Sequence, residues 1–160
     1  MRSLITQYLS GNRIKDLGNP EEAQDAATKA YVDKGDVIAS GLSTISANGN
    51  IGVSSHEDCP TRHFIKIANG VGTINVILNA NRYGTPLYVV FDNRNNSSAV
   101  KGAIATLKFQ GSNFSSSDQQ LLPLSLRSGF DIKGNDVVEI EYVVQYYSGK
   151  KLGLVKPTCI

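Results

Sequence analysis

The chain has 160 residues, a net charge of +2 and a hydrophobic fraction of 41%, which permit one ordinary domain with a packed core and exclude wholesale disorder. Its scattered Lys and Arg residues form no basic patch for nucleic acid or for an anionic membrane surface, and no apolar run approaches the ~20 residues that cross a bilayer. Residues 1–9 are too short and too polar for a signal peptide, so we expect the chain to begin near Met1.

The first third of the sequence has the composition of a linker followed by a short helix. Asp25 can cap a helix over residues 26–42, in which two glycines each cost roughly 1 kcal/mol relative to Ala. Such a helix is marginal alone, so we expect it to need either the domain that follows or copies of itself. The turn signal Asn48-Gly49 marks the end of this part.

The rest of the sequence consists of short strand patterns separated by polar turns. Residues 64–67 and 74–78 flank the turn Asn69–Gly72, which predicts a hairpin. The continuous apolar run Leu87–Phe91 predicts a central strand buried on both faces. Pro123 makes residues 121–126 an edge strand or a bulged one.

The clearest strand lies near the C-terminus, where apolar residues alternate with Glu139 and Glu141 over residues 138–144. Ser148-Gly149-Lys150 then turns the chain into residues 151–155, which predicts a closing hairpin. Seven or eight short strands of this kind predict a mainly β fold, namely an antiparallel β-sandwich that resembles a jelly roll.

Residues 12–33 carry a distinctive pattern. Asn12-Arg13-Ile14 leads through a turn with Pro20 into Asp25-Ala26-Ala27-Thr28-Lys29-Ala30-Tyr31-Val32-Asp33. This segment resembles one that recurs in bacteriophage fibre proteins, both head fibres and tail fibres. The resemblance implies a homotrimeric virion appendage, in which the segment joins a shaft or anchor to a β-rich head.

Three groups of residues follow as candidates for contacts. Small or apolar side chains that suit close approach between three chains are Ile14, Leu17, Ala26, Ala27, Ala30, Tyr31 and Ile38. Apolar side chains that suit docking onto another virion protein are Leu4, Ile5, Tyr8 and Leu9. Polar loop residues that suit contact with a host glycan or protein are Asn93, Asn95, Asn96, Asn113 and Ser115.

Few residues suggest chemistry. His56, Cys59 and His63 are the one metal-like cluster, but their spacing fits no closed structural zinc pattern, and a solvated loop is the simpler interpretation. A three-ligand site on a trimer axis stays open. Glu139 and Glu141 would lie about 7 Å apart on one strand face, which a solvated face explains as well as a catalytic pair does.

Four tyrosines, Tyr83, Tyr88, Tyr146 and Tyr147, are candidates for a sugar-binding surface. Tyrosine in a strand is more often a half-buried packing residue. A carbohydrate-binding module or an enzyme therefore stays open as a second class of function, although no acid pair with a nearby His or Arg stands out.

We expect a docking segment at residues 1–11, a linker with a trimerising helix at residues 12–47 and a β-sandwich head at residues 48–160. The short chain favours a head fibre that decorates the capsid. The alternatives are a short tail fibre or tail-tip receptor-binding protein, and a virion assembly or adaptor protein without host contact.

The expected partners are copies of the chain itself and another virion protein, which would be a capsid, capsid-decorating or tail protein. A host-surface glycan or protein is a further expected partner. We expect no enzymatic activity, no cofactor and no metal. The expected location is the virion, assembled in the cytoplasm of a bacterial host.

Overall fold

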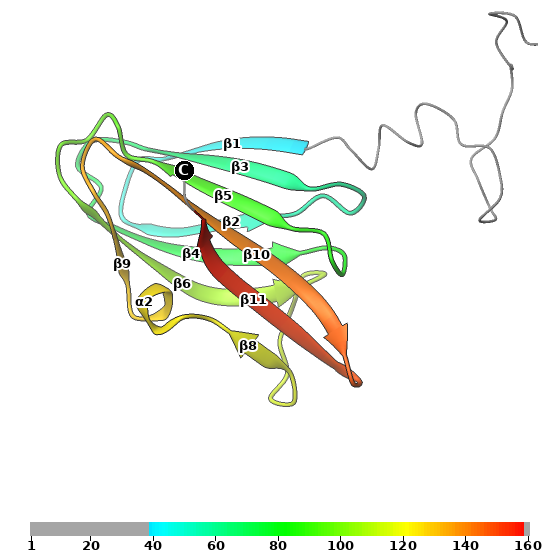
Figure 1. Ribbon diagram of the computed structural model, residues 1–160. Helices are drawn as coiled ribbons and strands as arrows, with labels where there is room; N and C mark the ends of the chain where they lie inside the picture. Colours follow the sequence, from blue (N-terminus) through cyan, green and yellow to red (C-terminus); the bar gives the residue numbers. More distant parts are fainter. Residues whose placement is uncertain (1–38, 159–160) are drawn as a thin grey trace, which may run out of the picture. The chain divides into compact units, whose positions relative to one another are not determined.

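Residues 39–158, the part of the chain described by a computed structural model, fold into two β-sheets packed face to face (Figure 1). The elements of this part are β1 (Ala39–Ile45), β2 (Gly49–Ser54), β3 (Thr61–Ile67), β4 (Thr73–Ala80), β5 (Leu87–Asp92), β6 (Val100–Phe109), β7 (Ser112–Asn113), β8 (Gln119–Leu121), α2 (Leu124–Arg127), β9 (Phe130–Ile132), β10 (Val137–Tyr147) and β11 (Lys150–Thr158). No helix among these residues is long and apolar enough to cross a membrane. The chain is mainly β, as predicted.

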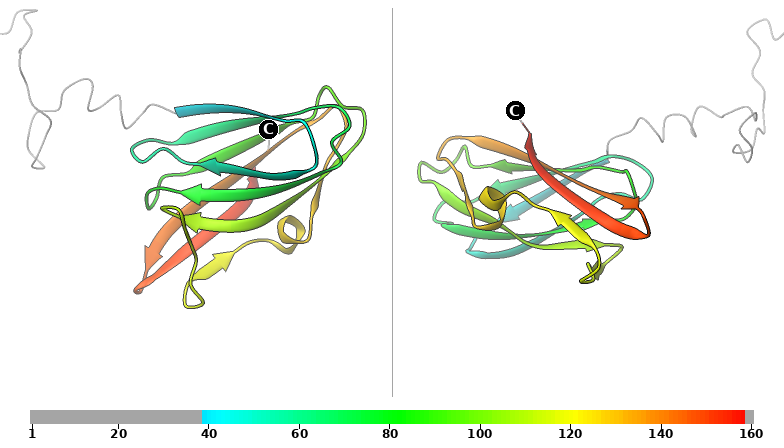
Figure 2. Two further views of the ribbon diagram at one scale, coloured as in Figure 1. Left: turned by 180° about the vertical axis from the view of Figure 1, so that it is seen from behind. Right: turned by 60° about the horizontal axis from the view of Figure 1, so that its bottom comes forward.

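We call the six-stranded sheet that contains β10 and β11 the front sheet (Figure 1). Its strand order is β1-β3-β5-β10-β11-β8. The back sheet has the order β2-β4-β6-β7, with β9 also paired to β6 (Figure 2). Alternating side chains of both sheets point between them and form the core, which includes Ile65, Phe91, Ile140, Tyr142, Ile74, Val76, Leu78 and Ile104. Each such side chain contributes about 1.5–3 kcal/mol through burial.

The first six strands alternate between the two sheets, so that each connection crosses from one sheet to the other. Strands β1, β3 and β5 therefore pair in parallel in the front sheet, and β2, β4 and β6 pair in parallel in the back sheet. Successive partners lie 22 to 29 residues apart, as in the pairs Ala39–Thr61 and Ile77–Thr106. These strands form three turns of a flattened coil, and the prediction of an antiparallel sandwich is wrong for this half of the domain.

The turn at residues 68–72 shows why the prediction failed. The sequence predicts a hairpin here, but β3 lies in the front sheet and β4 in the back sheet. Val71, in the middle of the turn, is buried against the core, and its amide donates a hydrogen bond to the Ala68 carbonyl. The buried Val71 side chain covers the core where the chain crosses from one sheet to the other. A hairpin turn within one sheet is exposed to water and does not need an inward apolar residue.

The C-terminal half agrees better with the sequence. Strands β10 and β11 form an antiparallel hairpin in which Tyr147 pairs with Lys150. The two loop residues, Ser148 and Gly149, have φ values of 50° and 78°, as a type I′ turn requires. Strand β5 lies between β3 and β10, which confirms the predicted central strand, but burial on both faces is not complete, because Tyr88 and Asp92 of its outer face are half-buried.

The predicted helix over residues 26–42 is wrong at its C-terminal end, because Ala39–Ile45 is strand β1. Gly41 is required there by packing, since a side chain at this position would collide with the ring of His63 on β3. The β-domain thus includes part of the segment that we expected to be a linker. The remaining predicted helical residues lie outside the described part of the chain.

Candidate functional site

The residues predicted to form contacts between chains and with the virion all lie at positions 1–38, outside the described residues. Both sets therefore stay predictions. The structure does describe the predicted receptor-contact loops, the metal-like cluster, the two glutamates and the four tyrosines. Some of these side chains lie on the surface and others are buried.

Two of the predicted receptor contacts are interior residues. Asn93 is fully buried, and its side-chain amide donates hydrogen bonds to the carbonyls of Ser98 and Lys133, at 3.0 Å each, and to that of Ile132 at 3.2 Å. Asn96 is also buried, and its side-chain oxygen Oδ1 accepts a hydrogen bond from the Ser98 backbone amide. Burial makes both side chains unavailable to a receptor, and the prediction is corrected for these two residues.

The other three predicted receptor contacts are exposed but do not form one surface. Asn95 follows β5, near the start of β6, whereas Asn113 and Ser115 follow the end of β6. Strand β6 has 10 residues, so the two loops lie roughly 30 Å apart. One small ligand therefore cannot contact both loops of the same chain.

The metal-like cluster does not assemble in the described residues, among which no three His, Cys, Asp or Glu side chains are placed to share a metal ion. Cys59 is buried. The His63 ring makes a hydrogen bond of 2.9 Å with the Ser43 hydroxyl, and burial lowers the pKa of His63. The amide of Asp58 donates to His56 Nδ1.

Glu139 and Glu141 lie on the outer face of the front sheet, each beside a cation. Glu139 Oε2 is 3.0 Å from Arg62 Nε, and its other oxygen accepts a hydrogen bond from the Thr158 hydroxyl. Glu141 Oε2 is 3.7 Å from Lys156 Nζ. The Arg62 guanidinium also lies over the Tyr88 ring, 4.9 Å from its centroid. These interactions explain the pair as part of an ion-pair row across the strands.

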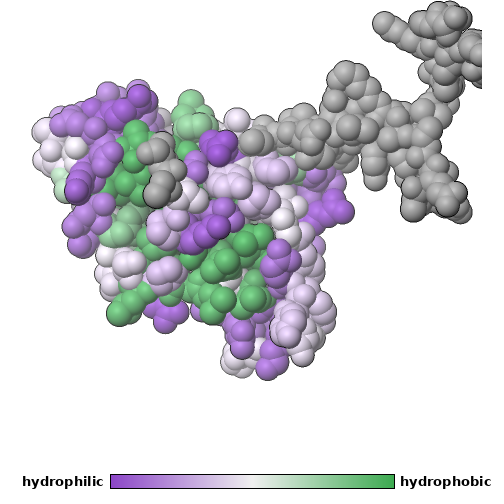
Figure 3. Space-filling model, in the orientation of Figure 1, coloured by the Kyte–Doolittle hydropathy of each residue, from purple (hydrophilic) through white to green (hydrophobic). Residues whose placement is uncertain are grey.

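The same outer face has an open depression of about 490 Å³, which is lined by Arg62, Phe64, Val90, Asp92, Arg94, Val137 and Glu139. Figure 3 shows this face with hydrophobic patches between hydrophilic ones. Leu42, Phe64 and Leu121 are exposed apolar residues of its strands. A broad face of this kind is better suited to another protein surface than to a small ligand.

A cluster of aromatic side chains lies near the turn of the β10–β11 hairpin. Tyr83 stacks on Phe109 with ring centroids 4.2 Å apart, and Tyr146 lies against Tyr83 at 5.5 Å and a tilt of 55°. The loop that carries Tyr83 is fixed to β10 by a hydrogen bond from the Gly84 amide to the Val144 carbonyl. Three aromatic rings from distant parts of the sequence thus form one cluster.

Lys151 and Asp118 border the aromatic cluster. The Lys151 ammonium lies 5.9 Å from the centroid of Phe109, 5.6 Å from that of Phe114 and 3.5 Å from Asp118 Oδ2. Burial opposes ionisation of Asp118, but hydrogen bonds from the Ser115 and Lys151 amides and from the Ser115 hydroxyl outweigh it. Together with the charge of Lys151 they lower the pKa of Asp118 to about 2, so the carboxylate is ionised at neutral pH.

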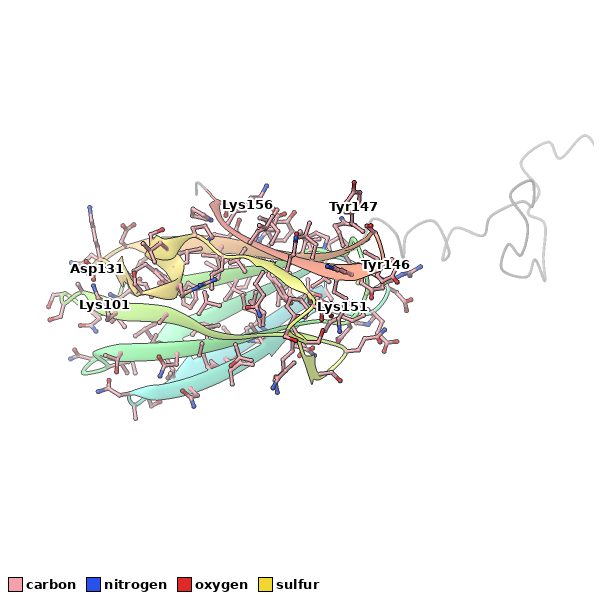
Figure 4. All side chains as sticks on the ribbon, turned by 90° about the horizontal axis from the view of Figure 1, so that it is seen from below. Lys101, Asp131, Tyr146, Tyr147, Lys151 and Lys156 are labelled. Atoms are coloured by element: carbon pink, nitrogen blue, oxygen red, sulfur yellow. The ribbon has the colours of Figure 1, made fainter. Side chains whose placement is uncertain are left out.

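These groups line a depression that we call the hairpin cleft. Its volume is about 340 Å³, and its walls are Tyr83, Phe109, Gln110, Ser112, Asp118, Tyr146, Gly149 and Lys151. Figure 4 shows Tyr146 and Lys151 at one end of the domain and the Lys101–Asp131 pair at the other. A second depression, of about 230 Å³, lies beside the same hairpin and is lined by Gln119, Tyr147, Ser148, Lys150, Lys151 and Leu152.

The structure therefore divides the four tyrosines predicted as a sugar-binding surface. Tyr83 and Tyr146 share the hairpin cleft, Tyr147 lines the neighbouring depression, and Tyr88 lies under Arg62 on the front sheet. No local pattern points to Phe109 or Lys151 as part of this site, because Phe109 has the position of a core residue in an alternating strand. Only the pairing of distant segments brings these two residues to the cleft.

Comparisons with known proteins give one short match. No family model matches the chain, and no solved structure matches it. Over 33 residues the chain is 61% identical to an "Anchor protein" of Klebsiella phage NTUH-K2044-K1-1. The match covers 21% of this chain and 10% of that phage protein, so it relates one segment of the chain to a small part of a longer protein.

Proposed function

We propose that this chain is a non-enzymatic structural component of a bacteriophage virion. The observation that carries the proposal is the 33-residue similarity, at 61% identity, to a phage anchor protein. The resemblance of residues 12–33 to a segment of phage fibre proteins points in the same direction. The β-domain is compatible with it, because its acidic pair is engaged in ion pairs with Arg62 and Lys156.

The more specific proposal is a short homotrimeric fibre that decorates the capsid as a head fibre. Residues 1–11 would dock onto another virion protein, and residues 12–38 would gather three chains. The β-domain would then be displayed away from the particle. The exposed Leu42, Phe64 and Leu121 on the front sheet offer further apolar surface that copies of the chain can bury.

A short tail fibre is the competing proposal, since the resemblance covers head and tail fibres alike. Immunogold labelling of intact particles with an antibody against the β-domain distinguishes them. Label over the capsid supports the head fibre, and label at the tail supports the tail fibre. Absence of the chain from mass spectra of purified particles would contradict the virion role itself.

The trimer is tested by the mass of the full chain in solution. We expect about three times the chain mass of 17.2 kDa at micromolar concentration. The double substitution Ala27→Glu and Ala30→Glu should dissociate the trimer, because it places charges where three helices are expected to approach closely. The matched control is Ala99→Glu, at an exposed position of the β-domain. A monomeric wild-type chain would contradict the proposal.

A further inference from the structure

We propose that the hairpin cleft is a carbohydrate-binding site that takes a pyranose ring against Tyr146 and Tyr83. This inference adds a ligand to the structural role proposed above. It stands on the geometry of the β-domain alone, so it can fail while the virion role holds, and the virion role can fail while it holds.

The first argument is the exposure of the aromatic rings. Tyr146 is 60% exposed and Tyr83 is 40% exposed, although the two rings contact each other. Hairpin packing alone would favour burial of both, because each ring loses a large apolar area from water when it is covered. Two adjoining rings left partly open to solvent in one otherwise polar depression instead leave ring surface that a ligand can contact.

The second argument is that this ring surface is already ordered. Phe109 stacks against Tyr83 at 21° between the ring planes, which fixes the plane of Tyr83. The hydrogen bond from the Gly84 amide to the Val144 carbonyl, at 2.8 Å, fixes its loop to the strand that carries Tyr146. A binding surface fixed in advance loses less conformational entropy when a ligand binds.

The third argument is the rim, which is polar and points to an oxygen-rich ligand. Gln110 and Ser112 contribute an amide and a hydroxyl, and Lys151 contributes an ammonium held by Asp118 and two phenyl rings. An apolar ring face surrounded by such donors and acceptors matches a sugar, which has C–H groups on its ring faces and hydroxyls at its edge. The volume of about 340 Å³ lies at the low end of the ~300–1,000 Å³ usual for small-ligand sites, which suits one or two sugar units.

The size and the rim disfavour a peptide segment as the occupant. A peptide would need a longer groove with backbone partners at a sheet edge. The cleft instead lies at a hairpin turn, where Gly149 is one of its walls. The hairpin cleft is also distinct from the depression on the outer face of the front sheet, whose lining includes Phe64 and Val137.

The test is binding of soluble oligosaccharides to the full chain, measured by saturation-transfer NMR and by calorimetry. The panel contains neutral hexose oligomers and oligomers with hexuronate units, prepared from bacterial surface polysaccharides. We expect binding in the millimolar range or tighter from at least one oligomer of either class. Tyr146→Ala should weaken it roughly tenfold, because the ring face is lost.

The matched control is Tyr147→Ala. Tyr147 is the next residue of the same hairpin and is 77% exposed, but it lines the other depression. Its substitution should change the affinity less than about twofold. Tyr146→Leu keeps apolar area at the position and should also weaken binding, which guards against a folding defect in the Ala variant.

Two results would overturn the inference. One is the absence of binding by every oligomer up to about 10 mM. The other is binding that Tyr146→Ala leaves unchanged, or that Tyr147→Ala weakens equally, since either would place the sugar outside the cleft. Neither result bears on whether the chain is present in the virion.

Discussion

The two ends of the β-sandwich use their loops in opposite ways. At the end near β9, the polar loop after β5 turns Asn93 and Asn96 into the interior, where Asn93 binds three backbone carbonyls. At the hairpin end, Tyr83 and Tyr146 are turned outward. Two buried asparagines therefore fix the loop at one end internally, whereas exposed aromatic rings form the candidate binding surface at the other end.

The largest expected effect is at the internally fixed end. Asn93→Ala removes the fully buried donor to the carbonyls of Ser98, Ile132 and Lys133, of which the hydrogen bond to Ile132 is itself buried. We expect the free energy of unfolding, measured by urea titration, to fall by about 2–3 kcal/mol. Asn95→Ala in the same loop is the control and should change it by less than about 0.5 kcal/mol. Equal effects of the two substitutions would remove the contrast between the two ends.

The next effect concerns two tyrosines of the same strand. Tyr142 is fully buried and its hydroxyl donates a hydrogen bond of 2.7 Å to the Lys108 carbonyl, which joins the front sheet to the back sheet. Tyr142→Phe should destabilise the domain by about 1–2 kcal/mol in the same titration, because that carbonyl loses its side-chain donor. Tyr147→Phe, at the exposed end of β10, should have almost no effect. An unchanged free energy of unfolding in Tyr142→Phe would contradict a net contribution of this hydrogen bond to stability.

The smallest effect is a pH dependence at the hairpin end. The pKa of Asp118 is lowered to about 2 from its ordinary value of 3.8, so the folded chain binds this proton less readily than the unfolded chain. Its contribution to stability is therefore complete above about pH 4 and is lost as the pH falls from about 4 to about 2. The melting temperatures of the wild type and Asp118→Asn should differ above pH 4 and converge toward pH 2.

The control for this experiment is Asp131→Asn at the opposite end. Asp131 forms an exposed ion pair with Lys101 at 2.9 Å, and such surface pairs contribute little to stability. Its substitution should shift the melting temperature only slightly at neutral pH. If the difference in melting temperature between the wild type and Asp118→Asn does not change with pH, the hydrogen bonds of Asp118 stabilise the domain and its ionisation does not.

Local sequence patterns predicted where the strands of this fold lie better than they predicted which strands pair with one another. The alternation over Val138–Val144 correctly gave the buried face of β10, and Ser148-Gly149 correctly gave a two-residue turn. The same alternation in β3 and β4 says which side chains face inward, but it is identical for a hairpin and for a connection between two sheets. Only the buried Val71 in the intervening turn distinguishes these two cases.

The candidate site was harder to predict for a related reason. The sequence predicts both Tyr83 and Tyr146 as sugar contacts, but the contact between their rings depends on pairing between segments some sixty positions apart. Asn93 looked like a surface residue because asparagine usually lies in solvated turns, and its inward orientation depends on the distant carbonyls of Ile132 and Lys133. Neither relation leaves a signal in a local window of sequence.

The coil formed by β1 to β6 has an evolutionary consequence. Each turn of the coil adds one strand to each sheet, and β1 and β2, from the first turn, lie at the edges of their sheets. A duplication or deletion of one whole turn would therefore lengthen or shorten both layers together and leave every inward side chain inward. An insertion of a single residue in a strand would reverse the two faces beyond it unless a bulge absorbs it, as in β6, where Val76 pairs with Ile104 and Ile77 with Thr106. The domain can therefore change its length by whole turns without loss of its two-layer core, but a change in the turn that carries Tyr83 and Phe109 would alter the hairpin cleft.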